Sequence, residues 1–291
     1  MAIDLHTHSL VSDGSETPTE VIRRAARAGL TAVALTDHDI LSGLAEAGEA
    51  ADRHGIELVP GVELSLDWSG MVPEANGLGG MHLIVLWVEN EAGPLQDRLA
   101  DLRMGRDDRN HTILERLAQL GLDIHIDDVA ARAGGGSVGR PHIAGVMVDR
   151  GYVPDIATAF DQYLAQGRPA YVGRRRLVPV EAIALARQAG GVPILAHPFT
   201  LGFDDDTRLV ETLERLAEAG LIGVETHHSG TEPERRRLLR KLATRLDLAP
   251  SGGSDFHGTY KPGIEVGTGI GDLAVPAEFL DELRHHRGSS R

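Results

Sequence analysis

Two histidines and a carboxylate stand close together near the start of the chain, in the stretch IDLHTHSLVSDG (3–14). His6 and His8 alternate where a short apolar run ends, and Asp13 follows them. Alternating residues of an extended chain point to the same side, so both imidazoles can reach one ion. The chain has 14 histidines in 291 residues, so an H-x-H pair alone is weak evidence of a metal site. Whether His6 and His8 bind a metal depends on where the fold places them.

Residues of the same kind follow several other apolar runs. His38 lies in ALTDHD, Glu63 in VPGVEL and His197 in ILAHP, while Asp255 and His257 alternate in SGGSDFH. One histidine at a strand end is more often a packed residue than a ligand, but five separate strand ends carrying His, Asp or Glu favour a metal site. The chain has no cysteine, so the ligands of such a metal would be nitrogen and oxygen.

Short β-branched or Leu-rich runs alternate with amphipathic stretches along most of the chain. One such stretch predicts a helix over 17–29, with Thr17 or Thr19 at its start and Gly29 at its end. Alternation at this spacing predicts parallel βαβ units, and about seven of them favour a barrel over an open sheet. The C-terminal strand ends of a parallel barrel meet at one face, so the residues that follow the runs would meet there. The predicted strands are 2–6, 31–37, 56–64, 82–88, 192–198, 222–228 and 248–255.

His82 departs from this pattern, because it precedes its apolar run instead of ending it. Either that strand runs in the opposite direction, or His82 lies on the loop before it. His227 and His228 end a strand without a partner pattern, and their role stays open. We interpret five other histidines, which lie near the end of a predicted helix, in the insertion or in the polar tail, as surface or packing residues. They are His54, His111, His125, His285 and His286.

The middle of the chain has a different character. Residues 101–170 carry apolar side chains at helical spacing without a convincing strand between them. We therefore predict a helical insertion at 101–170 between two parts of the barrel, 1–100 and 171–291. An insertion of this kind should cover the pocket, which favours a small substrate over a duplex.

The composition narrows the class of partner and the compartment. A net charge of −14 opposes non-specific binding to duplex nucleic acid. No run of about 18 apolar residues and no leader with a cleavage site is visible, so we expect no membrane partner. The absence of cysteine agrees with a cytoplasmic protein, which is our expectation. The sequence leaves the oligomeric state open.

Taken together, these motifs resemble the polymerase and histidinol phosphatase (PHP) domain, over 1–100 and about 170–270. The resemblance implies an α/β fold, a distorted (β/α)7 TIM-like barrel of the PHP type with a helical insertion, that holds two or three divalent ions. It also implies three sets of metal ligands, of which the first two share Glu63. These sets are His6, His8, Glu63 and Asp255; then Glu63, His82 and His197; then Asp13, His38 and His257.

Segment 139–198 resembles stand-alone PHP phosphoesterases that act on nucleotides. These include nucleoside 3',5'-bisphosphate phosphatases, an AMP phosphatase-like enzyme and a 5'-to-3' trimming ribonuclease. The resemblance implies hydrolysis of a phosphate monoester of a small nucleotide, a 3',5'-bisphosphonucleoside or AMP. The attacking group would be a metal-activated hydroxide held at the first ligand set. We expect Mn, chiefly because the family often uses it, and the donors also suit Fe, Zn or Mg.

Substrate recognition needs donors for phosphate, and the planar fork of arginine suits it. Arg140 in VGRPH and Arg174 in YVGR are the preferred phosphate ligands, and His142 could bind phosphate, donate a proton or only pack. Three other functions stay open: a 5'-3' exoribonuclease on short oligonucleotides, a histidinol-phosphate-type phosphatase, and a non-catalytic metal-binding module. An amidohydrolase barrel is disfavoured, because no lysine precedes Lys241 to bridge two metals.

Overall fold

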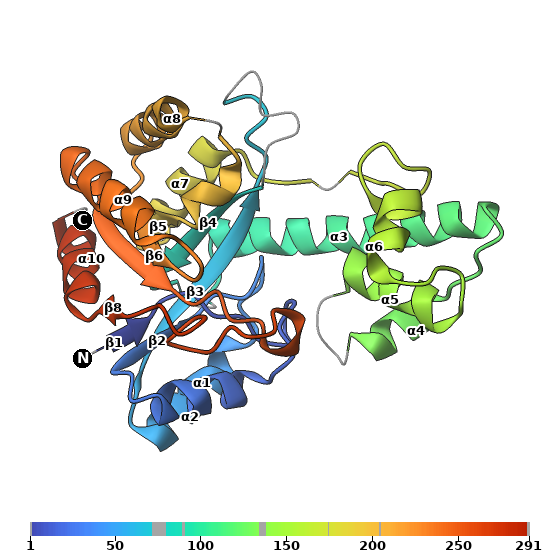
Figure 1. The fold of residues 1–291 in the computed structure, drawn as a ribbon, viewed down its shortest axis with the longest axis horizontal. Helices are drawn as coiled ribbons and strands as arrows, with labels where there is room; N and C mark the ends of the chain where they lie inside the picture. The colour runs from blue at the N-terminus through green and yellow to red at the C-terminus, as the bar shows by residue number, and fades with distance from the viewer. Residues whose placement is uncertain are drawn as a thin grey trace. The chain divides into compact units, whose positions relative to one another are not determined.

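The computed structural model describes residues 2–71, 80–88, 91–133, 138–173, 175–203 and 205–289. The chain folds into two compact units, one made of Met1–Asp97 with Arg176–Arg291 and the other of Arg98–Arg175. Figure 1 follows the chain through both units by colour. No helix in the described ranges is long and apolar enough to cross a membrane.

The first unit is built around one eight-stranded sheet in the order β7-β6-β5-β4-β3-β2-β1-β8. The edges approach each other, because the Leu5 amide donates to the Gly252 carbonyl at 3.0 Å and the His8 amide to the Phe256 carbonyl at 2.9 Å. The sheet is therefore a nearly closed barrel, which confirms the predicted fold class. The strands are β1 (Ala2–Asp4), β2 (Ala32–Leu35), β3 (Glu57–Leu66), β4 (Met81–Leu86), β5 (Val192–Leu195), β6 (Gly223–His228), β7 (Ala249–Gly253) and β8 (Val275–Pro276).

Strand direction explains the position of His82. β1, β2 and β3 are parallel, as are β5, β6 and β7, but β4 runs antiparallel to both of its neighbours. In the β3–β4 register His82 pairs with Ser65, near the end of β3. The start of β4 therefore lies beside the C-terminal ends of the other strands. The reversed strand, one of the two interpretations of His82, is confirmed.

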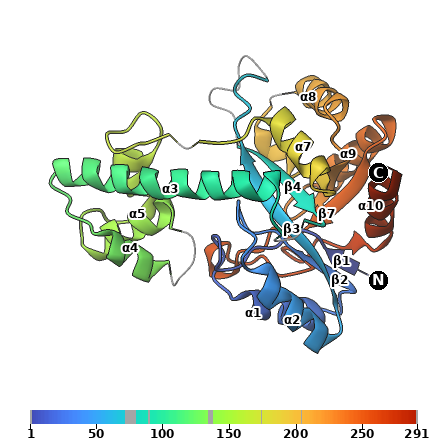
Figure 2. The ribbon, with the colours of Figure 1, turned by 180° about the vertical axis from the view of Figure 1, so that it is seen from behind.

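Helices cover the outside of the barrel (Figures 1 and 2). The first begins at Thr17, whose hydroxyl accepts a hydrogen bond from the Glu20 amide, and its chain turns at Gly29 with φ 73°. Thr17 is thus the cap, while the Thr19 hydroxyl donates to Glu46. The helices are α1 (Pro18–Arg27), α2 (Leu44–His54), α7 (Pro179–Gln188), α8 (Asp206–Glu218), α9 (Pro233–Arg245) and α10 (Glu278–Ser289), with short turns η2 (Pro198–Leu201) and η3 (Gly258–Tyr260).

Two apolar clusters hold this unit together, one on each face of β2. Ala32 and Ala34 pack with Ile3 and Leu5 in a cluster that α10 also joins. Val33 and other outward residues pack against α1 and α2. Alternate residues of a strand face opposite sides, so one short strand serves both clusters. Each large side chain buried in this way contributes about 1.5–3 kcal/mol to folding.

The second unit is built of helices and loops, with no strand among its described residues, and has its own apolar cluster. Ile113, Leu117, Ile143 and Met147 are all buried in that cluster. The helical insertion predicted at 101–170 falls within this unit. Its elements include most of α3 (Pro94–Gln119), then α4 (Ile126–Arg132), α5 (Arg140–Asp149), α6 (Ile156–Ala159) and the π-helical turn η1 (Phe160–Leu164).

Candidate metal centre

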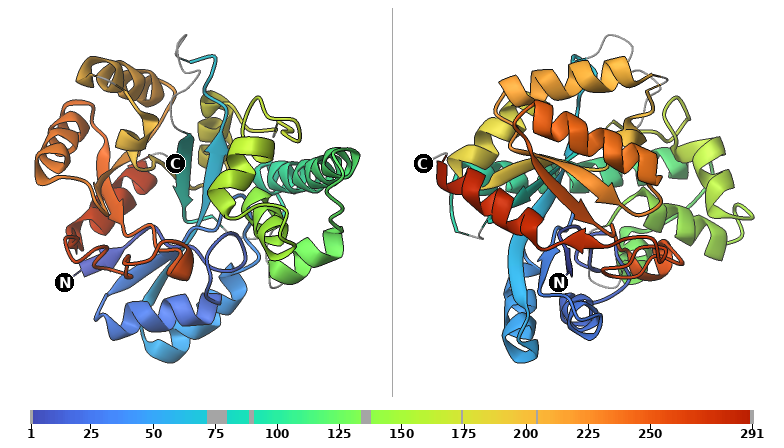
Figure 3. Two further views of the ribbon diagram at one scale, coloured as in Figure 1. Left: turned by 45° about the vertical axis from the view of Figure 1, so that its right-hand side comes forward. Right: turned by 60° about the vertical axis from the view of Figure 1, so that its left-hand side comes forward.

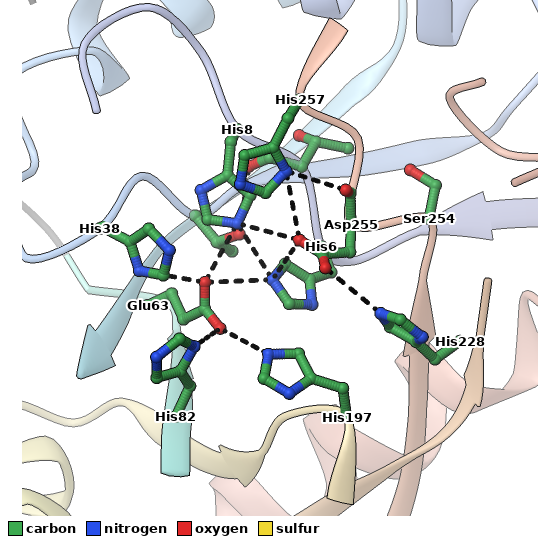
Figure 4. Close-up of polar contacts among 12 residues, drawn as sticks. His6, His8, His38, Glu63, His82, His197, His228, Ser254, Asp255 and His257 are labelled. Carbon is green, nitrogen blue, oxygen red and sulfur yellow. Dashed lines mark hydrogen bonds and ion pairs between the residues drawn. The ribbon is translucent and has the colours of Figure 1, made fainter. Parts of the chain in front are cut away.

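Figure 3 shows the strands of the barrel from two further sides. The predicted ligands gather where the C-terminal ends of the parallel strands meet, and Figure 4 shows most of them. Each comes from a strand or from the loop that follows it, except His82, which enters from the start of the reversed strand. Segments at opposite ends of the sequence thus supply one site. The residues are His6, His8 and Asp13 after β1, His38 after β2, Glu63 in β3, His82 in β4, His197 after β5, and Asp255 and His257 after β7.

Glu63 is the centre of this group, and only 1% of its side chain is exposed. Its Oε2 lies 3.3 Å from His6 Nε2, 3.1 Å from His8 Nε2 and 3.2 Å from His38 Nδ1. Its Oε1 lies 3.0 Å from His82 Nδ1 and 3.1 Å from His197 Nε2. One buried carboxylate therefore faces five imidazoles, which suits a group that bridges neighbouring cations.

Asp255 presents its two oxygens to different surroundings. Its Oδ1 faces His6 Nε2 and His8 Nε2, each at 3.5 Å, and His257 Nδ1 at 3.4 Å. Its Oδ2 is 3.3 Å from His228 Nε2 and also accepts from the Lys261 ammonium. Oδ1 thus lies among the predicted ligands, and Oδ2 is bound by two residues, His228 and Lys261, that are not predicted ligands.

Asp13 completes the group at its most exposed point, with 44% of its side chain accessible. Its Oδ1 lies 3.3 Å from His257 Nε2, and its Oδ2 lies 3.6 Å from His38 Nε2. His8 Nδ1 is 3.7 Å from the same carboxylate. The donors of this corner are therefore His8, Asp13, His38 and His257, one residue more than the resemblance implies for its third ion.

The backbone is strained at two of these residues. Asp255 has φ 56° and His197 has φ 26°, a region that residues with a Cβ rarely adopt. Conformations of this kind cost about 1–3 kcal/mol and persist where surrounding contacts enforce them, often at functional sites. The strain is an observation independent of the donor distances, and it falls at the same place.

The donor set fits divalent cations. His6 Nδ1 lies 3.1 Å from the Glu225 carboxylate, so neutral His6 keeps its proton on Nδ1 and turns the lone pair of Nε2 toward His8 Nε2, 3.1 Å away. His8 Nδ1 is buried and makes no hydrogen bond to any described residue. Lone pairs crowded beside carboxylates are satisfied by a cation, and four groups of at least three donors have their atoms within 4.8 Å of one another. Imidazole and carboxylate without thiolate suit Mn, Fe or Zn.

The protonation states of His8, His38 and Glu63 agree with that role. Burial, with the neighbouring His257, lowers the pKa of His8 to about 4, and burial lowers the pKa of His38 to about 4. Both imidazoles are therefore neutral at pH 7, the form that binds a metal. Burial alone would raise the pKa of Glu63, but the surrounding histidines hold it well below its usual range. Glu63 is ionised at neutral pH.

Glu225 is a residue of the site that the sequence analysis missed. It lies in β6, is buried, and accepts from the His197 amide at 2.7 Å as well as facing His6 Nδ1. A carboxylate on the far nitrogen of a histidine fixes the tautomer and aims the other nitrogen at a metal. A glutamate in the middle of the predicted strand IGVETHH was the available signal.

Two further side chains support the group. His228 contacts Asp255, which answers the question left open for this pair of histidines, whereas His227 packs on the ring of Phe279 with centroids 5.1 Å apart. The Thr200 hydroxyl lies 2.8 Å from His197 Nδ1 and so fixes that ring. Beside the centre is a cavity of about 290 Å³, lined by His38, Glu63, Gly80, His82, His197, Thr200, Asp255, His257 and Lys261.

The predicted phosphate ligands belong to the second unit. The Arg140 guanidinium donates to the Leu164 carbonyl at 3.0 Å and lies over the rings of Phe160 and Tyr171. His142 Nδ1 accepts from the Gly139 amide at 3.1 Å at the start of α5. Arg174 lies outside the described residues. Their binding of phosphate stays a prediction.

Comparison with known proteins identifies the family. A model of the PHP domain matches residues 4–121. The chain is 35% identical over 274 residues to a 3',5'-nucleoside bisphosphate phosphatase of Chromobacterium violaceum, covering 91% of this chain and 90% of the relative. It is also 35% identical over 255 residues to a 5'-3' exoribonuclease of Haemophilus influenzae, covering 87% and 89%.

A solved structure from Bifidobacterium adolescentis, provisionally described as a metal-dependent phosphoesterase, matches with a TM-score of 0.80 at 30% identity. The match covers 98% of this chain and 96% of that one. Similarity in both sequence and structure thus extends over nearly the whole chain. The chain therefore belongs to the PHP domain family, in its branch of stand-alone phosphoesterases.

Proposed function

We propose that this protein is a metal-dependent phosphatase that hydrolyses a phosphate monoester of a small nucleotide, a 3',5'-bisphosphonucleoside or AMP. The observation that carries the proposal is the arrangement of five imidazoles around the buried carboxylate of Glu63, beside a cavity of about 290 Å³. Such a cavity is at the small end of ligand sites, which suits a small substrate. The relative from Chromobacterium violaceum carries the matching name.

In this proposal some residues bind the metal ions and others orient the metal ligands. His6, His8, Glu63 and Asp255 would hold the ions closest to the reacting phosphate, and we propose Mn in two or three sites. Divalent ions in such a site lower the pKa of a coordinated water and offset the charge that develops on a phosphate and its leaving group. Glu225 and Thr200 keep the rings of His6 and His197 in a fixed orientation.

We also propose that Arg140, Arg174 and His142 bind the phosphate of the substrate, on the strength of the resemblance of segment 139–198. Guanidinium groups bind phosphate oxygens through two parallel hydrogen bonds. Replacing Arg140 by alanine should then raise the KM for phosphate esters, and an unchanged kcat/KM would refute this role.

A second candidate, a 5'-3' exoribonuclease acting on short oligonucleotides, is favoured by one observation. The relative with that name is as similar to this chain as the phosphatase is, at 35% identity over 255 residues. Both activities cleave a phosphate ester and would use the same cluster of donors. The identity of the substrate therefore has to be measured.

The test is a panel of Mn-loaded reactions with a 3',5'-bisphosphoadenosine, AMP, histidinol phosphate and a 5'-phosphorylated oligoribonucleotide. Release of phosphate from the first two, with the oligomer intact, would support the phosphatase. Stepwise shortening of the oligomer would show that the protein is an exoribonuclease and not a phosphatase. Activity on histidinol phosphate alone would also refute the nucleotide phosphatase.

His8→Ala and Asp255→Ala should abolish hydrolysis while the circular dichroism spectrum stays that of the wild type. Activity of either variant at the wild-type level would refute the metal assignment.

A further inference from the structure

The cavity beside the candidate metal centre has one lysine in its wall, Lys261, and no arginine among the described residues that line it. Lysine is rare in this chain, which has only Lys241 and Lys261 among 29 basic residues. The other lining residues are histidines, acidic residues, Thr200 and Gly80. Lys261 is not one of the predicted metal ligands, so its place in the wall of the cavity needs another explanation.

Lys261 follows η3 on the loop that carries Asp255 and His257. Its ammonium contacts Asp255 Oδ2, the oxygen turned away from His6, His8 and His257. The contact therefore leaves Oδ1 free for a metal. About 40% of the Lys261 side chain is exposed, against 9% for that of Asp255, so the ammonium stays accessible from the cavity.

An ammonium has three N–H donors, and the contact with Asp255 uses one of them. Two donors and the positive charge remain for a ligand in the cavity. The wall also contains the carboxylates of Glu63 and Asp255, which the proposed function assigns to the cations. The Lys261 ammonium adds a positive charge in the same wall, in addition to that of the cations, where a phosphate dianion would enter.

We propose that Lys261 binds the phosphate group of the substrate, an inference that rests on the proposed function as a phosphoesterase. Lysine binds phosphate as a compact point charge, and its flexible stem lets it follow the ligand. The residue lies in the same folding unit as the metal centre, on the loop after β7, and so brings a donor to the site from outside segment 139–198.

A purely structural role is the alternative explanation of the same contact. Lys261 would then only hold Asp255 in its strained conformation, and its loss would weaken metal binding instead of phosphate binding. The two roles differ in a measurable way, because one acts on the anion and the other on the cation.

The experiment uses full-length Lys261→Met, which keeps an unbranched side chain without the charge, and Lys261→Arg, which keeps the charge. Lys241→Met is the matched control, because Lys241 is exposed on α9. Calorimetric titration measures the Kd of inorganic phosphate for the Mn-loaded proteins and, separately, the Kd of Mn²⁺ for the metal-free proteins. Steady-state kinetics on the best ester of the panel gives KM and kcat.

For Lys261→Met we expect the Kd of phosphate and the KM to rise about tenfold or more, the loss of one charge-assisted hydrogen bond. The Kd of Mn²⁺ should stay within about twofold of wild type. Lys261→Arg should recover most of the phosphate affinity, and Lys241→Met should match the wild type.

Unchanged phosphate affinity in Lys261→Met would overturn the proposal, as would a weaker Mn²⁺ affinity together with normal phosphate binding at saturating Mn²⁺. Wild-type protein that binds no phosphate would overturn it too. If wild type binds phosphate through Lys261 but hydrolyses no ester of the panel, the binding role stands and the proposed function fails.

Discussion

Several histidines of the metal centre use their two ring nitrogens for different purposes. His6 turns Nε2 to the cluster and Nδ1 to Glu225, while His197 turns Nε2 to Glu63 and Nδ1 to the Thr200 hydroxyl. His257 faces Asp13 through Nε2 and the Asp255 carbonyl through Nδ1. A partner on the outer nitrogen fixes the tautomer, so the inner nitrogen presents its lone pair without reorganisation when a metal arrives.

Glu225→Gln should weaken metal binding. The amide keeps the shape of the side chain but loses the charge that supports His6, and changes of this kind typically cost about 10–100-fold in metal affinity. Titration calorimetry with Mn²⁺ measures the effect, and Glu234→Gln on exposed α9 is the control. A Glu225→Gln protein with wild-type Mn²⁺ affinity would show that this carboxylate does not support the site.

The residue scale also shows where prediction from the sequence ends. Motifs such as H-x-H and SDFH indicated the donors of the cluster, because alternation and strand ends are visible in the sequence. Glu225 has no such pattern, since its contact with His6 joins residues 219 positions apart. The role of His228 depends on Asp255, 27 positions away, which the spacing does not reveal.

The strands position these donors because the C-terminal ends of the parallel strands lie at the same end of the barrel. β1 is only three residues long, yet it delivers His6 and His8 because Asp4 fixes the chain around it. The buried Asp4 carboxylate accepts hydrogen bonds from the amides of His6, Ser254 and Gly267. One side chain thus joins β1 to the loop after β7 and to a turn before β8.

Asp4→Ala should destabilise the fold at this junction. It would leave three buried amides without their acceptor, and each such group costs about 1–3 kcal/mol. We expect the free energy of unfolding in urea to fall by about 3 kcal/mol or more. Asp52→Ala, at an exposed position of α2, should change it by less than about 0.5 kcal/mol. A similar small change for Asp4→Ala would mean that water replaces the carboxylate.

At the scale of elements, the apolar runs predicted the strands and the barrel because their periodicity is local. The direction of β4 could not be decided in the same way, since the run 82–88 is apolar whichever way the strand points. Pairing with β3 and β5 sets that direction. The short strand β8 has only two residues, too few to give a periodic signal.

At the scale of the whole molecule, the two units have separate apolar clusters, and the predicted metal ligands all belong to the first. These donors from β1, β2, β3, β4, β5 and β7 and their loops meet only in the folded barrel. We therefore expect a cation to bind the native state far better than the unfolded chain and to stabilise this unit by mass action. The stabilisation should be confined to the elements that supply ligands.

Removal of metal should therefore loosen the first unit and leave the core of the second unchanged. At an Mn²⁺ concentration of 100 times the Kd, binding contributes about 2.7 kcal/mol, so a chelator should lower the Tm of the barrel and added Mn²⁺ should restore it. Hydrogen exchange locates the effect: protection should fall in the loops after β1, β2, β5 and β7, while α5 exchanges as before. The His8→Ala protein, which lacks a ligand shared by two donor groups, should respond much less to Mn²⁺. An equal loss of protection in both units would show that the metal stabilises the whole chain and that the units do not unfold separately.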